Sequence, residues 1–319
     1  DALRIATDKF ASEFVLVRDK DVLDTWFSSG LWPFSTLGWP NVDDKDFQKW
    51  YPNSALVTGF DIIFFWVARM TMMGNIFTSK IPFKDVYIHG LVRDENNKKM
   101  SKSAGNGIDP LLLINKYGSD ALRFALVREV AGSGQDIRLD FDRKKKSSST
   151  VEASRNFANK IWNATKFVLI NCPSVDEVKN IKYEEYELEI TDKWILSRLN
   201  KTKKNLYVFL NSYKLGEAAK LIYEFVWNDF CDWYIEFAKL RFNDSELKNK
   251  TITEKLLRVI LDDILIMINP FMPHLTEELW HSLHLNNEDV FLSLQKWPNP
   301  IEKYLDDNLE QSFDKLFEI

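Results

Sequence analysis

The 319-residue chain has few cysteines, no excess of positive charge and no long uninterrupted apolar run. Its two cysteines, Cys172 and Cys231, are isolated in the sequence, which argues against a disulfide framework or a zinc cluster and favours the reducing cytoplasm. The net charge of −5 disfavours a non-specific nucleic-acid binder, which would be basic. No apolar run approaches the roughly 20 residues that span a bilayer, and the first residues do not form a signal peptide, so no membrane partner is expected.

Two kinds of sequence pattern divide the chain. The first part mixes short apolar strands, glycines and aromatic residues, and from about Ser147 the pattern changes to long amphipathic helices. This predicts an α/β segment followed by an all-α antiparallel helix bundle, in agreement with the usual ~100–200 residues per domain. The chain begins with Asp1 rather than methionine, and we expect it to be a piece of something longer.

The stretch from Lys98 to Pro110 has the composition of a phosphate-binding loop. It follows a predicted buried strand (residues 85–92) and ends in Asp109-Pro110, which predicts a helix N-cap followed by proline at the first helical position. The Gly-Asn-Gly sequence at 105–107 allows tight turns, because glycine and asparagine tolerate positive φ. Lysines there could stabilise charge that moves onto a polyphosphate. The alternative is a solvated basic turn.

Capping residues predict further helix starts. Ser119-Asp120 is expected to cap a helix over residues 121–130, and Thr251 with Glu254 matches a capping box at the start of another helix. Residues 137–141 alternate between apolar and polar side chains and predict a short strand.

An apolar segment follows the predicted strand Ser54–Thr58 and Gly59. Residues 61–73 are apolar on nearly every side, which predicts a buried helix opened by Asp61. A strand end followed by a glycine and a helix start is where α/β sheets bind ligands. Ile62 and Trp66 are four residues apart, so on a helix they would share a face and could form an apolar slot for a small branched side chain. The alternative is plain core packing.

Tryptophans elsewhere have simpler interpretations. Trp26 lies in the aromatic-rich stretch 21–40, which is too irregular for one long helix, and a buried core position is the alternative to any functional role. In the helical part, Trp227, Trp233 and Trp280 are expected in the core rather than as platforms on which bases stack.

The residues Lys99-Met100-Ser101-Lys102-Ser103 resemble the second signature of class I aminoacyl-tRNA synthetases. Two longer segments, residues 21–34 and 59–66, resemble the valyl-tRNA synthetase family within that class. Isoleucyl and leucyl enzymes carry more polar residues after the corresponding glycine, so a subfamily for another amino acid is disfavoured. The resemblance extends from about residue 21 to the end of the chain.

The resemblance implies a division of the chain into five regions. They are residues 1–20, the tail of an editing insertion; 21–110, the C-terminal half of a class I Rossmann-like catalytic domain; 111–150, a stem-contact region; 151–292, an anticodon-binding helix bundle; and 293–319, an extension toward a coiled-coil arm.

The resemblance also implies an activity, namely valine–tRNA ligase. Enzymes of this family activate valine with ATP and Mg²⁺ and transfer it to valine tRNA; a monomer is expected, with no metal held by this chain. The implied catalytic residues are Lys102 and, secondarily, Lys99. The implied ATP-binding residues are Lys99, Met100, Ser101, Lys102, Ser103, Gly59 and Asp61, and the implied amino-acid pocket consists of Trp26, Ile62 and Trp66.

One expected motif is missing. The first class I signature, His-x-Gly-His, occurs nowhere in the sequence, and His89-Gly90 does not replace it. We therefore expect a chain that is inactive alone. The alternative is a free-standing tRNA- or RNA-binding helical module without catalysis, although such a module would not need the 99–103 loop.

Overall fold

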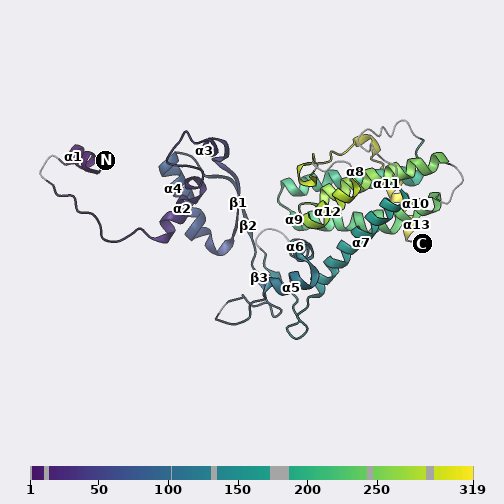
Figure 1. Cartoon of the computed structure of the whole chain (residues 1–319), viewed down its shortest axis with the longest axis horizontal. Coiled ribbons are helices and arrows are strands. Elements are labelled where there is room, and N and C mark those ends of the chain that lie inside the picture. The colour runs from purple at the N-terminus through teal and green to yellow at the C-terminus, as the bar shows by residue number, and fades with distance from the viewer. Residues whose placement is uncertain are drawn as a thin grey trace. The chain divides into compact units, whose positions relative to one another are not determined.

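The computed structural model describes residues 2–10, 14–101, 103–130, 135–172, 187–242, 247–284 and 291–318, and for residues 247–249 the backbone alone. The chain divides into two units, Asp1–Ile88 and His89–Ile319, and each is described by itself. Figure 1 labels the helices and strands of both units.

The first unit places two strands among short helices. Its elements are, in chain order, α1 (Ala2–Lys9), α2 (Thr25–Ser35), α3 (Lys45–Trp50), β1 (Asn53–Gly59), the 3₁₀ turn η1 (Phe60–Ile62), the π-helical turn η2 (Ile63–Val67), α4 (Ala68–Thr78) and β2 (Phe83–His89). β1 and β2 are hydrogen-bonded neighbours, and β1 confirms the predicted strand after Ser54. Aspartates start two of the helices, since Asp24 accepts a hydrogen bond from the Trp26 amide and Asp44 from the Asp46 amide.

The prediction of one buried helix over 61–73 is wrong in two respects. The backbone runs through η1 and η2 before α4 begins at Ala68, so Asp61 lies in a 3₁₀ turn. The segment is also largely exposed, with Phe64 at 81% and Met72 at 62% exposure. Val67 and Met70 pack against the strands, and the described residues of this unit cover little of the remaining apolar surface.

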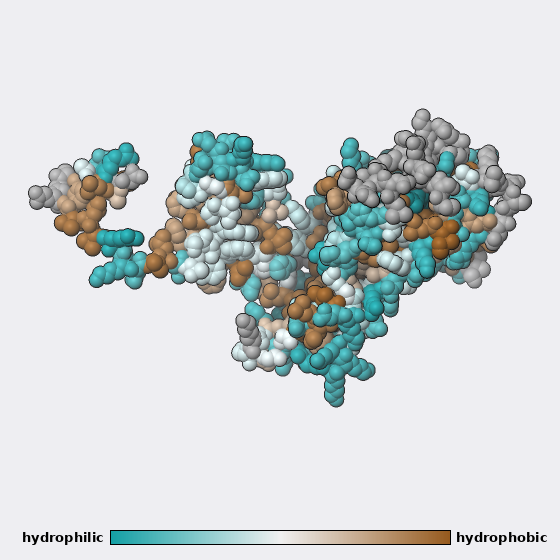
Figure 2. All heavy atoms as spheres, in the orientation of Figure 1, coloured by the Kyte–Doolittle hydropathy of each residue, from teal (hydrophilic) through white to brown (hydrophobic). Residues whose placement is uncertain are grey.

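The apolar character of this segment permits a second interpretation. By length and composition alone, Phe60–Thr78 could cross a membrane, with 19 residues, a mean hydropathy of 1.3 and 17% burial. One such helix is weak evidence, because a helix that is hydrophobic all round is also typical of the core of a large protein. Hydrophobic side chains at the surface of the unit are visible as brown spheres in Figure 2.

The second unit is mostly helical. Its elements are β3 (Val92–Arg93), α5 (Pro110–Tyr117), α6 (Ser119–Arg128), β4 (Ile137–Arg138), α7 (Ser149–Asn171), α8 (Ile190–Asn211), α9 (Leu215–Glu224), the π-helix η5 (Phe225–Tyr234), α10 (Ile235–Phe242), α11 (Leu247–Ile268), α12 (Pro273–Leu283), the 3₁₀ turns η6 (Leu292–Leu294) and η7 (Glu302–Tyr304), and α13 (Asp307–Phe317).

A short parallel ladder lies at the start of this unit. β3 pairs with β4, with Val92 opposite Ile137 and Arg93 opposite Arg138. The strand predicted over 85–92 is therefore divided between β2 and β3. Gly90 lies in the break, and a Cβ atom there would be 1.8 Å from the carbonyl oxygen of Gln135, so the close backbone approach requires glycine.

The predicted helix starts had different outcomes. Asp109 caps α5 as predicted, since its carboxylate accepts a hydrogen bond from the Leu111 amide at 2.9 Å. The predicted cap at Ser119-Asp120 is wrong, because α6 begins at Ser119 and no side chain caps it; Asp120 instead accepts a hydrogen bond from the Leu275 amide at 2.6 Å, in the first turn of α12. The capping box at Thr251 is wrong, because α11 begins four residues earlier, at Leu247.

The helices of the second unit enclose one large apolar core. Its largest fully buried side chains include Phe157, Trp194, Phe225, Phe230 and Tyr234, from α7, α8 and η5. Of the tryptophans predicted in the core, Trp280 is buried, Trp227 is half-buried against it, and Trp233 is 37% exposed.

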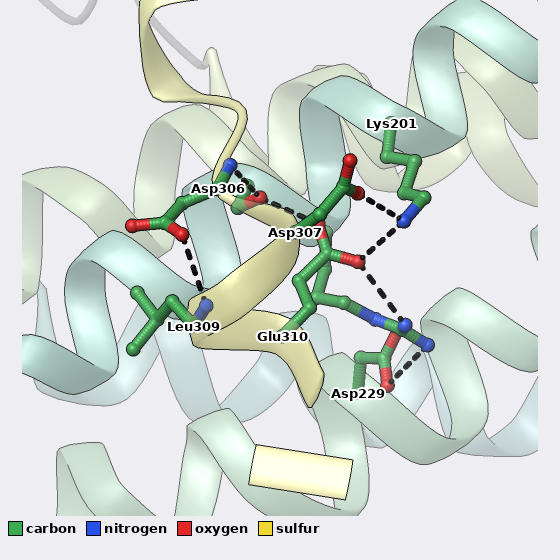
Figure 3. Close-up of polar contacts among 8 residues, drawn as sticks. Lys201, Asp229, Asp306, Asp307, Leu309 and Glu310 are labelled. Atoms are coloured by element: carbon green, nitrogen blue, oxygen red, sulfur yellow. Dashed lines mark hydrogen bonds and ion pairs between the residues drawn. The ribbon is translucent and has the colours of Figure 1, made fainter. Parts of the chain in front are cut away.

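A buried carboxylate connects α13 to the rest of this unit (Figure 3). Glu310 is 2% exposed and accepts a hydrogen bond from the Ser197 hydroxyl of α8 at 2.5 Å. Its other oxygen lies 3.1 Å from Lys201 Nζ and 3.5 Å from Arg198 Nη1. The buried charge is thus met by two cations and a hydroxyl, all three of them on α8.

The segment just before α13 is hydrogen-bonded to α8. The Asp306 amide donates to the Ser197 hydroxyl at 2.9 Å, and the Ile301 amide donates to the side chain of buried Asn200 at 2.8 Å. Polar groups of α8 that lie inside the unit are thus satisfied by the segment 301–310.

Candidate active-site segments

The basic loop predicted from the sequence lies between β3 and α5 in the second unit. It returns antiparallel to β3 through a bridge between Arg93 and Lys99. Ser101 organises the next turn, since its hydroxyl accepts a hydrogen bond from the Ala104 amide at 3.1 Å and lies 3.2 Å from that of Ser103. Gly105 then adopts φ +61°, which confirms the predicted need for a residue that tolerates positive φ.

The side chains predicted to bind ATP in this loop lie at the surface. Lys99, Ser101 and Ser103 are exposed and Met100 is half-buried. Lys102, the implied principal catalytic residue, lies outside the described residues. The described part of the loop is therefore accessible to a ligand from solvent, and Lys99 is the described lysine within the signature.

The base of the loop is fixed by an ion pair across the β3–β4 ladder. Asp136 accepts hydrogen bonds from the Leu91 amide at 2.8 Å and from Arg93. Both hydrogen bonds favour the charged carboxylate and hold the pKa of Asp136 below its usual range. The bond from the Leu91 amide has the larger effect. The carboxylate thus stays ionised and keeps the loop's first strand in place.

Gly59 and Asp61, the other predicted ATP-binding residues, lie in the first unit. Gly59 is the buried last residue of β1 and directly precedes η1, while Asp61 is exposed within η1. The predicted order of strand end, glycine and helical turn is therefore present, although the turn is 3₁₀ rather than α. This arrangement exposes a carboxylate beside a strand end.

Trp66 is the predicted pocket residue that lines a cavity. A cavity of about 200 Å³ in the first unit is bordered by Trp66 and Trp32, with Pro33, Leu56, Val57 and Phe83 among its other walls. The rings of Trp66 and Trp32 stack with centroids 5.5 Å apart. Thr36 and Asn53 add polar groups to the lining, and a cavity of this size is below the roughly 300 Å³ of pockets for larger ligands and suits a small side chain.

Trp26 and Ile62 are not among the residues that border this cavity. Trp26 stacks on Phe65 with centroids 5.9 Å apart, and the Arg69 guanidinium lies 5.5 Å from its ring centroid. Ile62 is half-buried at the junction of η1 and η2, with φ −114° and ψ 11°, so the helical face it was expected to share with Trp66 does not exist.

Trp32 is the residue that sequence reasoning missed. It stands in α2, in the same aromatic-rich stretch as Trp26, and that stretch was the signal available. Nothing local in the sequence indicates which of these rings meets Trp66, since the two segments are separated by β1.

Among the described residues, no group of three or more His, Cys, Asp or Glu side chains could hold a metal ion. The carboxylates near the loop are instead engaged with backbone amides, arginines and an asparagine. Their chemistry is that of positioning groups.

Two family models match the chain. The model for tRNA synthetases class I (I, L, M and V) matches residues 1–140, and the model for the anticodon-binding domain of tRNA ligase matches residues 192–319. The first match includes the segment Phe60–Thr78, which agrees better with a catalytic-domain helix than with a membrane span.

Curated relatives of the chain include valine–tRNA ligases. That of Prochlorococcus marinus subsp. pastoris is 68% identical over the whole chain, and that of Thermosynechococcus vestitus is 56% identical over 98% of it. The chain spans 35% and 34% of the lengths of these two relatives.

Solved structures of low identity share the fold. A ternary complex of LeuRS, tRNA and LeuAMS from Agrobacterium radiobacter K84 matches 91% of this chain and 34% of its own, with TM-score 0.72 and 20% identity. Methionyl-tRNA synthetase of Mycobacterium tuberculosis in complex with methionyl-adenylate matches 81% of this chain and 51% of its own, with TM-score 0.59 and 20% identity.

Proposed function

The chain belongs to the class I tRNA synthetases, and we propose that it is the part of a valine–tRNA ligase that carries the second signature loop and the anticodon-binding domain. The observation that carries this proposal is identity of 54–68% with valine–tRNA ligases through essentially the whole chain. The complete enzyme would activate valine with ATP and transfer it to valine tRNA.

In the activation step, the carboxylate of valine attacks the α-phosphorus of ATP. The bond from that phosphorus to the bridging oxygen breaks, and pyrophosphate leaves with the electron pair. We assign Lys102, and secondarily Lys99, to the charge that grows on the pyrophosphate, because a charge-assisted contact is roughly twice as strong as a neutral hydrogen bond. Mg²⁺ is assigned to the phosphates of ATP, and no step is routed through a metal site in this chain.

The remaining predicted site residues keep the roles that the family resemblance implies. Gly59 and Asp61 are proposed beside ATP, and Met100, Ser101 and Ser103 around its phosphates. Trp66 is proposed as a wall of the valine pocket, with Trp26 and Ile62 nearby. The stacked Trp32 supports Trp66 in this role, since it fixes the indole at the border of the small cavity.

We propose that the helices from α7 onward form an antiparallel bundle that binds valine tRNA. The domain limits predicted from the sequence, at residues 20, 110, 150 and 292, are retained as part of this proposal, together with a monomer in the cytoplasm. The match of residues 192–319 to an anticodon-binding family model supports the tRNA partner.

The activity is tested in a complete enzyme. The matching part of the Prochlorococcus marinus subsp. pastoris ligase is replaced by this chain, and valine-dependent exchange of pyrophosphate into ATP is measured. Lys102→Ala should lower kcat by about 10²–10³-fold with little change in KM for ATP, the loss typical of one electrostatic donor. Lys193→Ala, a surface lysine on α8, is the control. An inactive chimera, or full exchange in Lys102→Ala, would contradict the proposal.

The alternative of a free-standing RNA-binding module is not favoured, because the first 140 residues match a synthetase catalytic family. It is tested by binding of the 319-residue chain to valine tRNA and to the same tRNA with an altered anticodon over a salt series. Binding that falls with salt and weakens on the anticodon change supports an anticodon domain. Equal binding of both tRNAs would mean that electrostatic attraction alone explains the binding, and it would contradict recognition of the anticodon.

A further inference from the structure

The described contacts of the signature loop converge on one side chain, that of Asn106. Its Oδ1 accepts a hydrogen bond from the Ser101 amide at 3.0 Å. Its Nδ2 donates to the carbonyl oxygen of Lys99 at 3.2 Å and to the carboxylate of Asp94 at 2.9 Å. A carboxamide offers both an acceptor and two donors, so the residue type matches all three partners.

Asp94 anchors this side chain. It is 2% exposed, and its Oδ1 accepts hydrogen bonds from the amides of Lys98 at 2.7 Å and Asn96 at 3.0 Å. The bond from Lys98, followed by that from Asn106, holds the pKa of Asp94 below its usual range. Asp94 therefore presents a charged acceptor to Asn106 throughout the neutral pH range.

Arg143 holds the same residue from the other side. Its Nη2 donates to the backbone carbonyl of Asn106 at 2.7 Å, and its guanidinium binds both oxygens of Glu95, at 2.5 and 3.2 Å. Glu95 is the neighbour of Asp94, so one arginine links both ends of the loop. The guanidinium is suited to this because its donors form a rigid fork.

Apart from the bridge between Arg93 and Lys99 and the turn at Ser101, the loop has few other contacts that define its backbone. Residues 101 and 103–105 are exposed, and no apolar core residue lies within this stretch of the described loop. Polar contacts to Asn106, together with the bridge between Arg93 and Lys99, therefore determine where the backbone of Lys99 and Ser101 lies. A misplacement of about 1 Å can cost ~10²-fold in rate, so a side chain that fixes this backbone affects the chemical step.

We propose that Asn106 is a positioning residue for valine activation, which holds the Lys99 carbonyl and the Ser101 amide against Asp94 so that the signature loop meets the phosphates of ATP in one geometry. This inference rests on the proposed function. Asn106 does not touch the reacting atoms, and its effect passes through the loop backbone.

The test exchanges donor and acceptor. Asn106→Asp replaces a donor by a second carboxylate beside Asp94, whereas the double variant Asp94→Asn with Asn106→Asp restores one donor–acceptor pair with the roles reversed. In the chimeric ligase, Asn106→Asp should lower kcat for pyrophosphate exchange by about 10–100-fold, with KM for ATP changed less than about threefold, and the double variant should regain about tenfold. Asn163→Asp, the same change at an exposed position on α7, is the control and should stay near the parent.

A second measurement needs no catalysis. Amide hydrogen exchange of the 319-residue chain should be faster by about tenfold or more in residues 99–104 of Asn106→Ala, with α7 and α8 unchanged. Unchanged exchange, or kcat equal to the parent in Asn106→Asp, overturns the positioning role while the parent chimera's activity leaves the proposed function standing. An inactive parent chimera contradicts the proposed function instead, and hydrogen exchange still decides whether Asn106 holds the loop.

Discussion

The guanidinium of Arg198 on α8 and the carboxylate of Asp229 on η5 form an ion pair with 2.9 Å between Nε and Oδ2. The carboxylate is nearly buried while the arginine is 30% exposed. Burial raises the pKa of Asp229 to about 6 even though Arg198 opposes the shift, so desolvation outweighs the attraction between the charges. Nearby carboxylates of Glu310 and Asp314 add to the rise.

This ion pair predicts a pH dependence of folding. The folded pKa of about 6 lies above the ~3.9 of an unfolded aspartate, so the folded chain binds this proton more tightly. The contribution of Asp229 to stability is therefore largest below about pH 4 and is lost as the pH rises through 6, by up to about 3 kcal/mol. Asp229→Asn removes this titration, and its free energy of unfolding relative to the parent should rise between pH 4 and 7.

Urea unfolding at several pH values checks this prediction. Asp232→Asn is the control, because Asp232 lies on the same π-helix but is 43% exposed in its pair with Lys160, and its difference from the parent should change by less than about 1 kcal/mol. A constant difference between Asp229→Asn and the parent over this range would contradict the argument.

Glu310 predicts a loss of stability on truncation. Glu310→Ala leaves the Ser197 hydroxyl without its acceptor and separates Lys201 and Arg198 from their shared buried carboxylate. The expected cost is about 1–3 kcal/mol, below the ~3–5 for a fully buried pair because both cations reach solvent. Asp307→Ala should change stability much less, since that carboxylate is 76% exposed while bound to the same lysine. Equal midpoints of urea unfolding for the two variants would contradict the prediction that Glu310 contributes more to stability than Asp307.

Gly216 lies at the contact between α6 and α9, where we expect a larger side chain to lower the stability of the chain. A Cβ atom there would lie 1.8 Å from the carbonyl oxygen of Val130. Gly216→Ala must displace the backbone of one helix end and should cost about 1–3 kcal/mol, the range for overpacking. Gly107→Ala meets nothing within 4 Å and is the matched control in a thermal melt. A melting temperature of Gly216→Ala equal to that of the control would show that the contact can relax.

The two cysteines predict chemical inertness. Cys172 and Cys231 are 2% and 5% exposed, and burial raises the pKa of each thiol to about 12. Almost no thiolate is present at pH 8, and the sulfur atoms are inaccessible, so a disulfide reagent should modify neither in the native chain and both in guanidinium. Rapid modification of either thiol without denaturant would contradict this prediction. It would mean that the core around that cysteine opens to solvent in the native chain.

Sequence reasoning succeeded for the start of α5, where the determining partner is near in the chain. Asp109 and Pro110 mark the start of α5, because a cap depends on backbone groups a few residues away. It failed for Asp120, whose partner Leu275 lies 155 residues further on. Composition identified residues 61–73 as apolar, but hydrophobicity alone does not specify 3₁₀ and π turns or which surface covers them.

The candidate site follows the same rule. The residue types of the 99–103 loop were recognisable because they are contiguous. Asn106 was identified only as a turn former, since its role depends on Asp94, twelve residues earlier, and on Arg143. Trp66 was predicted from its own segment, whereas its stacking partner Trp32 depends on how α2 folds back across the unit.

The attachment of α13 has a consequence for the time course of biosynthesis. Ser197 and Asn200 are made 109 and 101 residues before the amides of Asp306 and Ile301 that hydrogen-bond to them. At roughly 5–20 residues per second, α8 leaves the ribosome on the order of 5–20 s before these partners exist. During that interval its buried polar groups depend on water, so the helical unit reaches its final packing only after residue 310 has emerged.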